Sequence, residues 1–562
     1  MHLVESVSKL INITPVLHEL SAGIASEYYC AAGRKRAFAL VTTGPGLTNM
    51  ITAFAGAYTE GRELLVIGGQ VKTEDLANGA VRQRGIQEID GVGIVRPISK
   101  AAVRIKEPIS RARFFSLVAQ SWTPKKGPVF LEIPLDVQAL EVNKEELESD
   151  PVRAKTDELG LPNVDSKNYR LIVDKLIQAL RPVILLGGGL DRGVAWNCRN
   201  KLNKLGIPIM TTYNGADRIG AEDPMYFGRP NTWGQRYSNI LIQQSDLVLA
   251  LGTRLGLQQT GFNWQEFVPN GEIVQVDIDS DELNKGHPTI AVKVQADAND
   301  FLERLCSETF IEKGEWLTFC NTVKQLLPLN EPASNQCYQG YINPYQFFAA
   351  ISDLSRADDI VIPCSSGGAF TCAYQAFSQK TGQIMLSNKS LASMGYGLAG
   401  AIGASLANCD KRVILFEGDG GFAQNMQELG TVDASQINLK IFVFDDQGYA
   451  SIRMTQRNYF GGRYVGCDRQ TGLGLPNWNK VFDSFGINCI RLHPGFELNE
   501  EFLESFNSKA PQGYLVTIHP EQTYFPKISS RVKPSGGMES NPLHRMTPDL
   551  PEDLKSCVLK YI

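Results

Sequence analysis

The sequence has no long apolar run and little excess of charge of either sign. No stretch reaches the roughly 18 consecutive apolar residues that a membrane-spanning helix needs. Its 55 Lys and Arg residues nearly balance its 60 Asp and Glu residues, and the net charge of -5 provides no basic surface for nucleic acid. The first residues form an amphipathic stretch and lack the pattern of a signal peptide. We therefore expect a cytoplasmic protein that binds neither membranes nor nucleic acid.

Several motifs that carry common chemistries are missing as well. The 11 cysteines are odd in number, scattered and without a Cys-x-x-Cys pair, which disfavours a zinc site or a disulfide framework and favours a reducing compartment. The six histidines form no pair at helical spacing. Neither a Walker P-loop nor a Gly-x-Ser-x-Gly nucleophile motif occurs. These absences disfavour zinc enzymes, P-loop nucleotide hydrolases and α/β-hydrolases.

Short apolar runs alternate along the chain with longer segments of helical spacing. Runs of this kind, followed by glycine or an acid, are typical of strands buried on both faces of a parallel sheet. Their alternation with helices predicts βαβ units and doubly wound sheets. The expected strands are 37–41, 64–68, 129–133, 183–186, 247–251, 273–278, 413–416, 441–444 and 514–518, and the expected helices include 169–180, 296–305 and 344–355.

Two changes in composition predict domain boundaries. Residues 143–165 are charged and poor in apolar side chains, and residues 326–341 are rich in Pro, Asn and Gln. We therefore expect three α/β domains at residues 1–150, 165–325 and 340–562. Beyond residue 518 the chain is rich in proline, which predicts an ordered tail draped over the surface with little room for helices.

The most informative segment is FEGDGGF at 416–422, which directly follows an expected strand and precedes an expected helix at 425–436. Glycines at a strand-to-helix turn let backbone N–H groups approach a phosphate, and the helix N-terminus favours the anion. Asp419 would add a hard oxygen ligand for Mg²⁺. An ordinary βα turn is the alternative interpretation, because Gly and Asp are common in such turns.

A second acidic turn follows the next expected strand, at DDQGY in 445–449. The carboxyl ends of neighbouring parallel strands lie side by side, at the edge where open α/β sheets bind ligands. Asp419 and Asp446 are therefore expected to share one cation, although 27 positions separate them. For a single acid, a role as a helix cap or turn residue is the alternative.

The spacing of these two turns resembles the cofactor signature of thiamine diphosphate (ThDP) enzymes. The resemblance implies that Asp419, Asp446 and the carbonyl of Gly448 bind Mg²⁺, which clamps the diphosphate. It also places in the cofactor site Gly418, Gly420, Gly421 and Tyr449. The sequence departs from the family pattern in one respect: Asp445-Asp446 stands where Asn-Asn is usual, and the extra carboxylate alters the charge of the site.

Other segments extend the resemblance to most of the chain and narrow it to acetolactate synthase-like enzymes. TTGPGLTN at 42–49, IGGQ at 67–70, IQEID at 86–90 and PISK at 97–100 are similar to the pyrimidine-binding domain. LASMGYG at 391–397 and EQTYFPK at 521–527 are similar to the diphosphate-binding domain. The resemblance thus implies a pyrimidine-binding, a central and a diphosphate-binding domain, in that order.

The same resemblance assigns roles to individual side chains. Glu19 matches the glutamate that protonates N1′ of the aminopyrimidine, and Met394 matches the apolar residue that props ThDP in its bent shape. Taken alone, Glu19 would be an ordinary acid in the first turn of a helix, and Met394 a core residue. Further active-site matches are Gln70, Gln87 and Lys100, whereas Ser365, Ser366 and Gly367 are expected to line the diphosphate.

The resemblance also implies a state of assembly. In the family, the cofactor lies between the pyrimidine-binding domain of one subunit and the diphosphate-binding domain of another. An obligate homodimer is therefore expected, and pairs of dimers, which give homotetramers, are common among relatives.

Flavin occupancy of the central domain stays open. GGGLDRG at 187–193, LGTRL at 251–255 and VDID at 276–279 are similar to segments that hold FAD in acetolactate synthases. A single glycine-rich βα turn is weak evidence for a dinucleotide. Many relatives keep this domain with the flavin site empty or otherwise occupied.

Relatives usually begin with a strand and a Gly-rich loop ahead of the first helix. This sequence opens inside that unit, with an expected helix at 2–11 that has one apolar face. We therefore expect the first strand to be missing, an edge of the first sheet to be exposed, and activity to be low.

The resulting hypothesis is a ThDP- and Mg²⁺-dependent carboligase. It would decarboxylate a 2-oxo acid, pyruvate first among them, and transfer the acyl unit to a 2-oxo acid or keto sugar. The tail and the segment 449–453 are closer to relatives in sugar and surface-polysaccharide pathways than to branched-chain amino-acid synthases. The alternatives are a ThDP-dependent C–C hydrolase or lyase and a catalytically impaired structural homologue.

Overall fold

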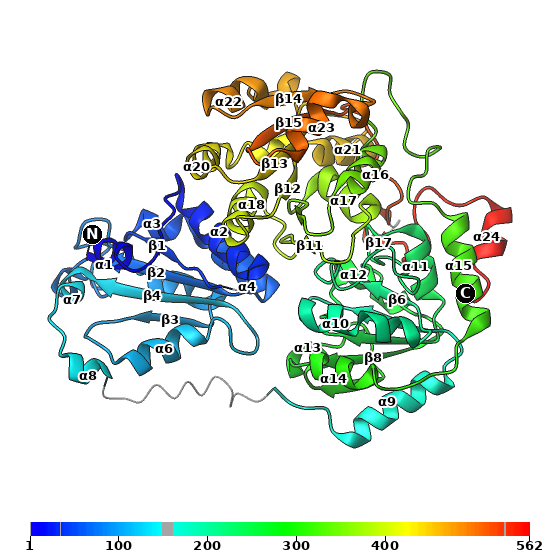
Figure 1. Ribbon diagram of the computed structural model, residues 1–562, viewed down its shortest axis with the longest axis horizontal. Coiled ribbons are helices and arrows are strands. Elements are labelled where there is room, and N and C mark those ends of the chain that lie inside the picture. The colour runs from blue at the N-terminus through cyan, green and yellow to red at the C-terminus, as the bar shows by residue number, and fades with distance from the viewer. Residues whose placement is uncertain (1, 34, 149–160, 533–535) are drawn as a thin grey trace.

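The computed structural model describes residues 2–33, 35–148, 161–532 and 536–562. Three parallel sheets follow one another along the chain, each with helices packed against its faces (Figure 1). This architecture confirms the predicted α/β class with three doubly wound sheets. Within the described residues, no helix is both long and apolar enough to cross a bilayer.

The first unit contains a four-stranded sheet of order β1-β2-β4-β3. All its strand pairs are parallel, and Gln70 at the carboxyl end of one strand is level with Pro134 at the same end of its neighbour. Its strands are β1 (Ala39–Val41), β2 (Leu64–Gln70), β3 (Ala101–Arg104) and β4 (Pro128–Pro134). Its helices are α1 (His2–Ser8), α2 (Glu19–Ala32), α3 (Pro45–Thr48), α4 (Ile51–Glu60), α5 (Gly91–Val95), α6 (Arg111–Ala119), α7 (Leu135–Gln138) and α8 (Lys144–Glu148).

The central unit contains a five-stranded parallel sheet of order β6-β5-β7-β8-β9. Its strands are β5 (Pro182–Leu186), β6 (Ile209–Thr211), β7 (Leu247–Leu251), β8 (Glu272–Asp277) and β9 (Val292–Gln295). Its helices are α9 (Ser166–Gln178), α10 (Arg192–Lys204), α11 (Arg236–Gln243), α12 (Leu257–Thr260), α13 (Ser280–Asn284), α14 (Ala298–Leu305) and α15 (Gly314–Leu326). Strands β5 and β7 are buried along their whole length, as their unbroken apolar runs predict.

The third unit contains a six-stranded parallel sheet of order β11-β10-β12-β13-β15-β14. Its strands are β10 (Ile360–Ile362), β11 (Ile384–Met385), β12 (Val413–Gly418), β13 (Leu439–Asp445), β14 (Cys489–Leu492) and β15 (Gln512–Thr517). Its helices are α16 (Pro344–Leu354), α17 (Gly367–Ala376), α18 (Tyr396–Ala407), α19 (Asp419–Phe422), α20 (Leu429–Ser435), α21 (Ala450–Tyr459), α22 (Trp478–Ser484) and α23 (Glu500–Asn507).

The tail beyond the third sheet runs back over the central unit. It forms the hairpin β16 (Ser530–Val532) and β17 (Met538–Ser540) and ends in α24 (Glu552–Val558), so it contains more regular structure than predicted. Its side chains Leu543 and Val558 are fully buried in an apolar cluster of the central unit. The described part of the tail is therefore ordered and packed, as predicted.

Helix α18 packs along α2 and joins the first unit to the third (Figure 1). Small residues permit the close approach, since a Cβ on Gly403 would lie 2.1 Å from the carbonyl oxygen of Ala25. A buried ion pair lies beside this contact: Arg62 Nη1 is 3.0 Å from Glu27 Oε1, and Tyr396 donates to the other carboxylate oxygen. This network fixes the two units against each other.

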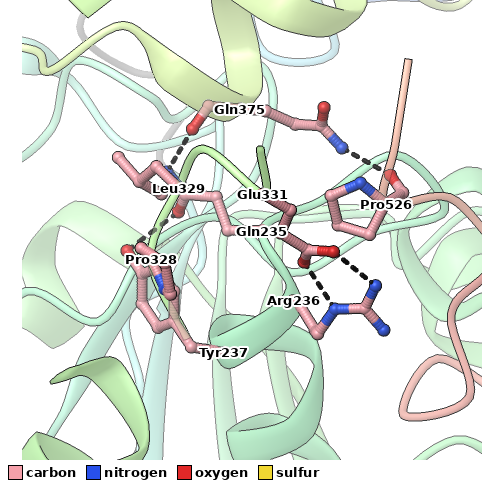
Figure 2. A pocket seen from close by; sticks show the side chains of 8 residues that line it. All are labelled: Gln235, Arg236, Tyr237, Pro328, Leu329, Glu331, Gln375 and Pro526. Atoms are coloured by element: carbon pink, nitrogen blue, oxygen red, sulfur yellow. Dashed lines mark hydrogen bonds and ion pairs between the residues drawn. The ribbon is translucent and has the colours of Figure 1, made fainter. Parts of the chain in front are cut away.

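The central unit, the connector after α15 and the tail meet at a second junction (Figure 2). Arg236 pairs with Glu331 at 2.6 Å, and the Gln375 side chain donates to the carbonyl of Pro526. The cavity between them is only about 10 Å³, which at most accommodates one water molecule. This junction is therefore structural and holds no ligand site.

The N-terminal helix differs from its prediction. It ends at Ser8 and not at Ile11, and none of its residues is buried. Leu10 and Ile11, expected on its apolar face, follow the helix and are 87% and 53% exposed.

Candidate active site

The strand order of the third sheet places its ligand crevice between β10 and β12. These strands are adjacent, and the chain leaves them toward opposite sides of the sheet, which is where open α/β sheets bind ligands. Gly367 opens α17 after β10, and Gly418 ends β12 directly before α19. A Cβ on either glycine would meet no atom within 4 Å, so the two turns border open space.

This crevice fits an anion such as a diphosphate. The first turn of α17 presents free backbone N–H groups, and the Ser366 side chain makes no capping hydrogen bond to them. Ser365 is 2% exposed, and its hydroxyl has no partner among the described residues. A buried hydroxyl without a partner is costly, so a ligand oxygen is the natural partner for it. The predicted residues Ser365, Ser366 and Gly367 are thus brought to one side of the crevice.

Asp419 lies on the opposite side and is 1% exposed. One of its carboxylate oxygens accepts from the Gly420 amide at 2.6 Å, and the other from the Gly448 amide at 3.0 Å. The turns after β12 and β13 are therefore joined directly. Burial, and then the nearby Asp446 carboxylate, raise the pKa of Asp419 well above its usual range.

Asp446 is held by a buried arginine that we did not identify from the sequence. Arg453 Nη2 donates to the Asp446 carbonyl at 2.8 Å and lies 3.4 Å from its carboxylate. Burial raises the pKa of Asp446 to about 7, although Arg453 opposes the shift. The only sequence signal for Arg453 is its position in the helix after the acidic turn.

The unusual Asp445 does not add an unpaired charge to the crevice. Its carboxylate accepts a 2.8 Å hydrogen bond from Arg491 Nη1, which lies on edge strand β14. Thr517 on the intervening strand β15 also accepts from this guanidinium group. The extra negative charge is thus compensated by a cation at the side of the sheet.

The residues of this crevice fit a divalent ion that is bound partly by backbone. Two buried carboxylates, of which Asp446 raises the pKa of Asp419, are a favourable place for a cation. Within the described residues no three His, Cys, Asp or Glu side chains gather at a metal-binding spacing. Mg²⁺ would therefore need further ligands besides the two carboxylates. A backbone carbonyl, such as that of Gly448, the diphosphate of the cofactor and water could supply them.

Three of the predicted cofactor residues meet beside Asp419. A Cβ on Gly420 would lie 2.3 Å from the Tyr449 ring and 3.5 Å from the terminal methyl of Met394, so only glycine fits there. Met394 is partly exposed. Gly421 lies against Glu417, whose burial raises the pKa of its carboxyl group to about 8.

Glu19 occupies the first turn of α2 and is partly exposed. His18 caps the helix through its ring nitrogen, and Asn49 donates to Glu19 Oε2 at 3.0 Å. The backbone N–H groups of Leu17 and His18 donate to Glu428 of the third unit. These contacts fix the start of α2, and they leave the second Glu19 oxygen without a hydrogen bond among the described residues.

Comparison with known families identifies the three units. Residues 1–94 match the N-terminal TPP binding domain of thiamine pyrophosphate enzymes, residues 170–305 their central domain, and residues 366–515 their C-terminal TPP binding domain. The chain belongs to the thiamine pyrophosphate enzyme family. It is a ThDP-dependent enzyme that resembles acetolactate synthase.

Similar proteins cover nearly the whole chain. A probable acetolactate synthase large subunit of Methanococcus aeolicus is 29% identical over 88% of this chain and 83% of its own. The acetolactate synthase isozyme 1 large subunit of Escherichia coli strain K12 is 28% identical over 93% of this chain and 90% of its own. The acetolactate synthase large subunit of Porphyra purpurea is 27% identical over 96% of this chain and 92% of its own.

Two further residues predicted for the active site of this thiamine pyrophosphate enzyme, Gln70 and Gln87, differ in burial. Gln70 is buried at the carboxyl end of β2, where its amide bonds Thr43, Ile89 and Glu132, so its polar atoms are used within the first unit. Gln87 is exposed, and its backbone packs against Gly44.

Lys100 is not brought together with the other predicted residues of this chain. It precedes β3 and donates to the Pro124 carbonyl at 2.9 Å. Its backbone pairs with Pro128, the first residue of β4, whereas Gln70 is level with the last residue of that strand. Lys100 therefore lies at the opposite end of the strands from Gln70. Its placement gives no support to an active-site role.

The glycine-rich loop of the central unit does not fit the diphosphate of FAD. It lies at the switch point between β5 and β7, but two of its amides are already used: Gly187 donates to Leu251 and Gly189 to Gly252. The buried Arg218 side chain covers the loop and donates to the Gly188 carbonyl. The loop is packed against its own fold, and no free amides remain at Gly187 and Gly189 to meet phosphate oxygens.

Proposed function

We propose that this enzyme uses ThDP and Mg²⁺ to decarboxylate a 2-oxo acid and to transfer the resulting acyl unit to a carbonyl acceptor. The observation that carries the proposal is the junction of Asp419 with the Asp446 turn, opposite the open N-terminus of α17. The printed names of the relatives, acetolactate synthase large subunits, support pyruvate as the donor.

The two acids serve as the metal clamp. Asp419, Asp446 and the Gly448 carbonyl would hold Mg²⁺, and the ion would hold the diphosphate against Ser365 and the amides of α17. Arg453 donates to the Asp446 carbonyl, and its positive charge offsets part of the charge of the Asp446 carboxylate. When bound, ThDP supplies the electron sink for the pair of electrons released as carbon dioxide leaves.

Glu19 serves as the acid that controls the cofactor. Its free carboxylate oxygen would exchange a proton with N1′ of the aminopyrimidine, while Asn49 holds the other oxygen in place. Met394 and the Tyr449 ring would support the rest of the cofactor beside Gly420. A carboxyl group of this kind works best when water is excluded, and in this chain alone Glu19 stays partly exposed.

A second copy of the chain would complete the site. Large apolar side chains near the start of α2 and beside the Met394 and Tyr449 turns are exposed, and a homodimer would cover them. They are Leu17 at 63%, Leu391 at 38%, Ile452 at 43% and Phe460 at 67%. We propose a homodimer as the smallest active unit, with a pair of dimers as the larger assembly. Light scattering coupled to gel filtration measures both.

We propose that the enzyme works without flavin, because the amides of Gly187 and Gly189 in its glycine-rich loop are used within the fold. An absorbance spectrum of the purified protein tests this. A flavin band that persists through gel filtration would contradict it.

The proposed reaction is tested by carbon dioxide release from pyruvate in the presence of ThDP and Mg²⁺. Mass spectrometry of products from pyruvate and a panel of 2-oxo acids and keto sugars then identifies the acceptor. Release of carbon dioxide with a new carbon–carbon bond supports a carboligase. No release above background would favour the C–C hydrolase or lyase alternative.

A further inference from the structure

The tail places a tyrosine against the first turn of α17. Tyr524 is 4% exposed, and its hydroxyl has no partner among the described residues. Its ring packs on the second residue of α17: a Cβ on Gly368 would lie 2.7 Å from the hydroxyl oxygen and 2.5 Å from the ring carbon that bears it. The hydroxyl is therefore at the first turn of α17, beside open space at Gly367.

Rigid contacts on both sides hold Tyr524 in this position. The backbone of Phe525 exchanges two hydrogen bonds with the Asn335 side chain, at 2.8 and 2.9 Å. The Pro526 carbonyl accepts from Gln375 of α17, as Figure 2 shows, and the Pro520 carbonyl accepts from Arg453. The backbone on both sides of Tyr524 is thus held in place by hydrogen bonds.

The surroundings leave the hydroxyl a single chemical role. Burial, and then the Asp446 carboxylate, raise the pKa of Tyr524 well above its usual range, so the phenol stays protonated and donates. The Ser365 hydroxyl, which is also buried without a partner among the described residues, lies just before the same helix start. Two orphan donors at one helix N-terminus call for an anion with several acceptor oxygens.

We propose that the Tyr524 hydroxyl donates a hydrogen bond to a phosphate oxygen of the bound diphosphate, which makes the C-terminal tail part of the cofactor site. The inference rests on the proposed function, because the ligand is the diphosphate of ThDP. It adds a donor from a segment that lies outside the three matched domains, since the last match ends at residue 515.

The test compares two variants that each lose one orphan hydroxyl. Tyr524→Phe removes the proposed donor. Tyr226→Phe is the matched control, because the Tyr226 hydroxyl is also buried with no partner in the described part of the chain but belongs to the central unit. Calorimetry measures ThDP binding with saturating Mg²⁺, and thiamine, which has no diphosphate, serves as the second ligand.

We expect Tyr524→Phe to weaken ThDP binding about 10- to 100-fold, the loss for a hydrogen bond to a charged group, and to leave thiamine binding unchanged. Tyr226→Phe should bind ThDP like the wild type. In the absence of ligand both variants should melt at or above the wild-type temperature, because each loses an unsatisfied hydroxyl.

The inference is overturned if Tyr524→Phe binds ThDP as tightly as the wild type, if both variants lose affinity equally, or if Tyr524→Phe alone melts at a lower temperature without ligand. A wild-type protein that binds no ThDP would instead overturn the proposed function, so the two failures are distinguishable.

Discussion

The Gly448 amide donates a 3.0 Å hydrogen bond to the carboxylate of Asp419, across the ends of two neighbouring strands. This contact joins two turns that are 29 positions apart in sequence. It orients one Asp419 oxygen toward the acidic turn, where Asp446 contributes the second carboxylate. The proposed metal site therefore depends on strand order in the third sheet.

Substitution of Glu19 by Gln should abolish most turnover and spare cofactor binding. The amide cannot exchange a proton with the aminopyrimidine, and the loss of a positioned acid typically costs about 10²- to 10⁴-fold in rate. Carbon dioxide release from pyruvate and ThDP calorimetry measure the two effects. Glu552→Gln, on the exposed surface of α24, is the control. Wild-type turnover in Glu19→Gln would refute the assignment.

The stability of the ligand-free protein should fall as pH rises toward neutrality and beyond. The pKa of Asp446 is raised to about 7 by burial, and that of Asp419 lies well above its usual range. The folded state thus binds protons more tightly than the unfolded chain, in which Asp has a pKa of about 3.9. Stability from this source is present at low pH and is lost as pH rises through the folded-state pKa.

Mg²⁺ and ThDP should reverse this trend, because the metal competes with protons for the same oxygens. Thermal melts from about pH 6 to about pH 8, with and without both ligands, measure the effect. The ligand-induced rise in melting temperature should grow with pH. A rise that shrinks with pH would show that these carboxylates do not bind the metal.

Substitution of Asp445 by Asn should move this pH dependence. Asp445 contributes to the raised pKa of both Asp419 and Asp446, after burial in each case. The midpoint for binding of Mg²⁺ with ThDP should therefore shift to lower pH in Asp445→Asn. Arg491→Gln removes the cation that pairs with Asp445 and should shift the midpoint the other way. Shifts in the same direction would contradict the compensation of Asp445 by Arg491.

Removal of Arg62 should destabilise the contact between α2 and α18. The Glu27 carboxylate is 0% exposed and would be left without its cation, which typically costs about 3–5 kcal/mol. Urea unfolding of Arg62→Met measures the change. Lys9→Met breaks an exposed pair with Glu5 and should cost at most about 1 kcal/mol. Equal losses of unfolding free energy in both variants would show that the buried pair contributes no more to stability than the exposed one.

The longer buried strands were predictable, whereas several sheet edges and the short buried strands β6 and β10 were not predicted. Every apolar run predicted as a strand forms one, because strands buried on both faces leave an unbroken apolar pattern. Strand β3, which is only partly buried, and edge strand β14, which contains Arg491, carry no such pattern. The helix expected at 425–436 is divided into a short 3₁₀ turn and α20.

The candidate site was predictable only where neighbouring strand ends determine it. Asp419 and Asp446 follow adjacent strands, so their proximity could be deduced from the order of motifs. Arg491 compensates Asp445 from a strand two places away in the sheet, a relation that depends on topology. Lys100 belongs to a motif of the first unit that was expected in the site. The strand register nevertheless places it at the opposite end of the strands from Gln70.

The central claim is that Asp419 and Asp446 together hold a divalent ion that binds the diphosphate of ThDP. Calorimetric titration of the wild type and of Asp419→Ala with ThDP, in Mg²⁺ and in a chelator, tests it most directly. We predict tight binding by the wild type in Mg²⁺ only and none by Asp419→Ala. Binding that survives either the chelator or the substitution undiminished would contradict the claim.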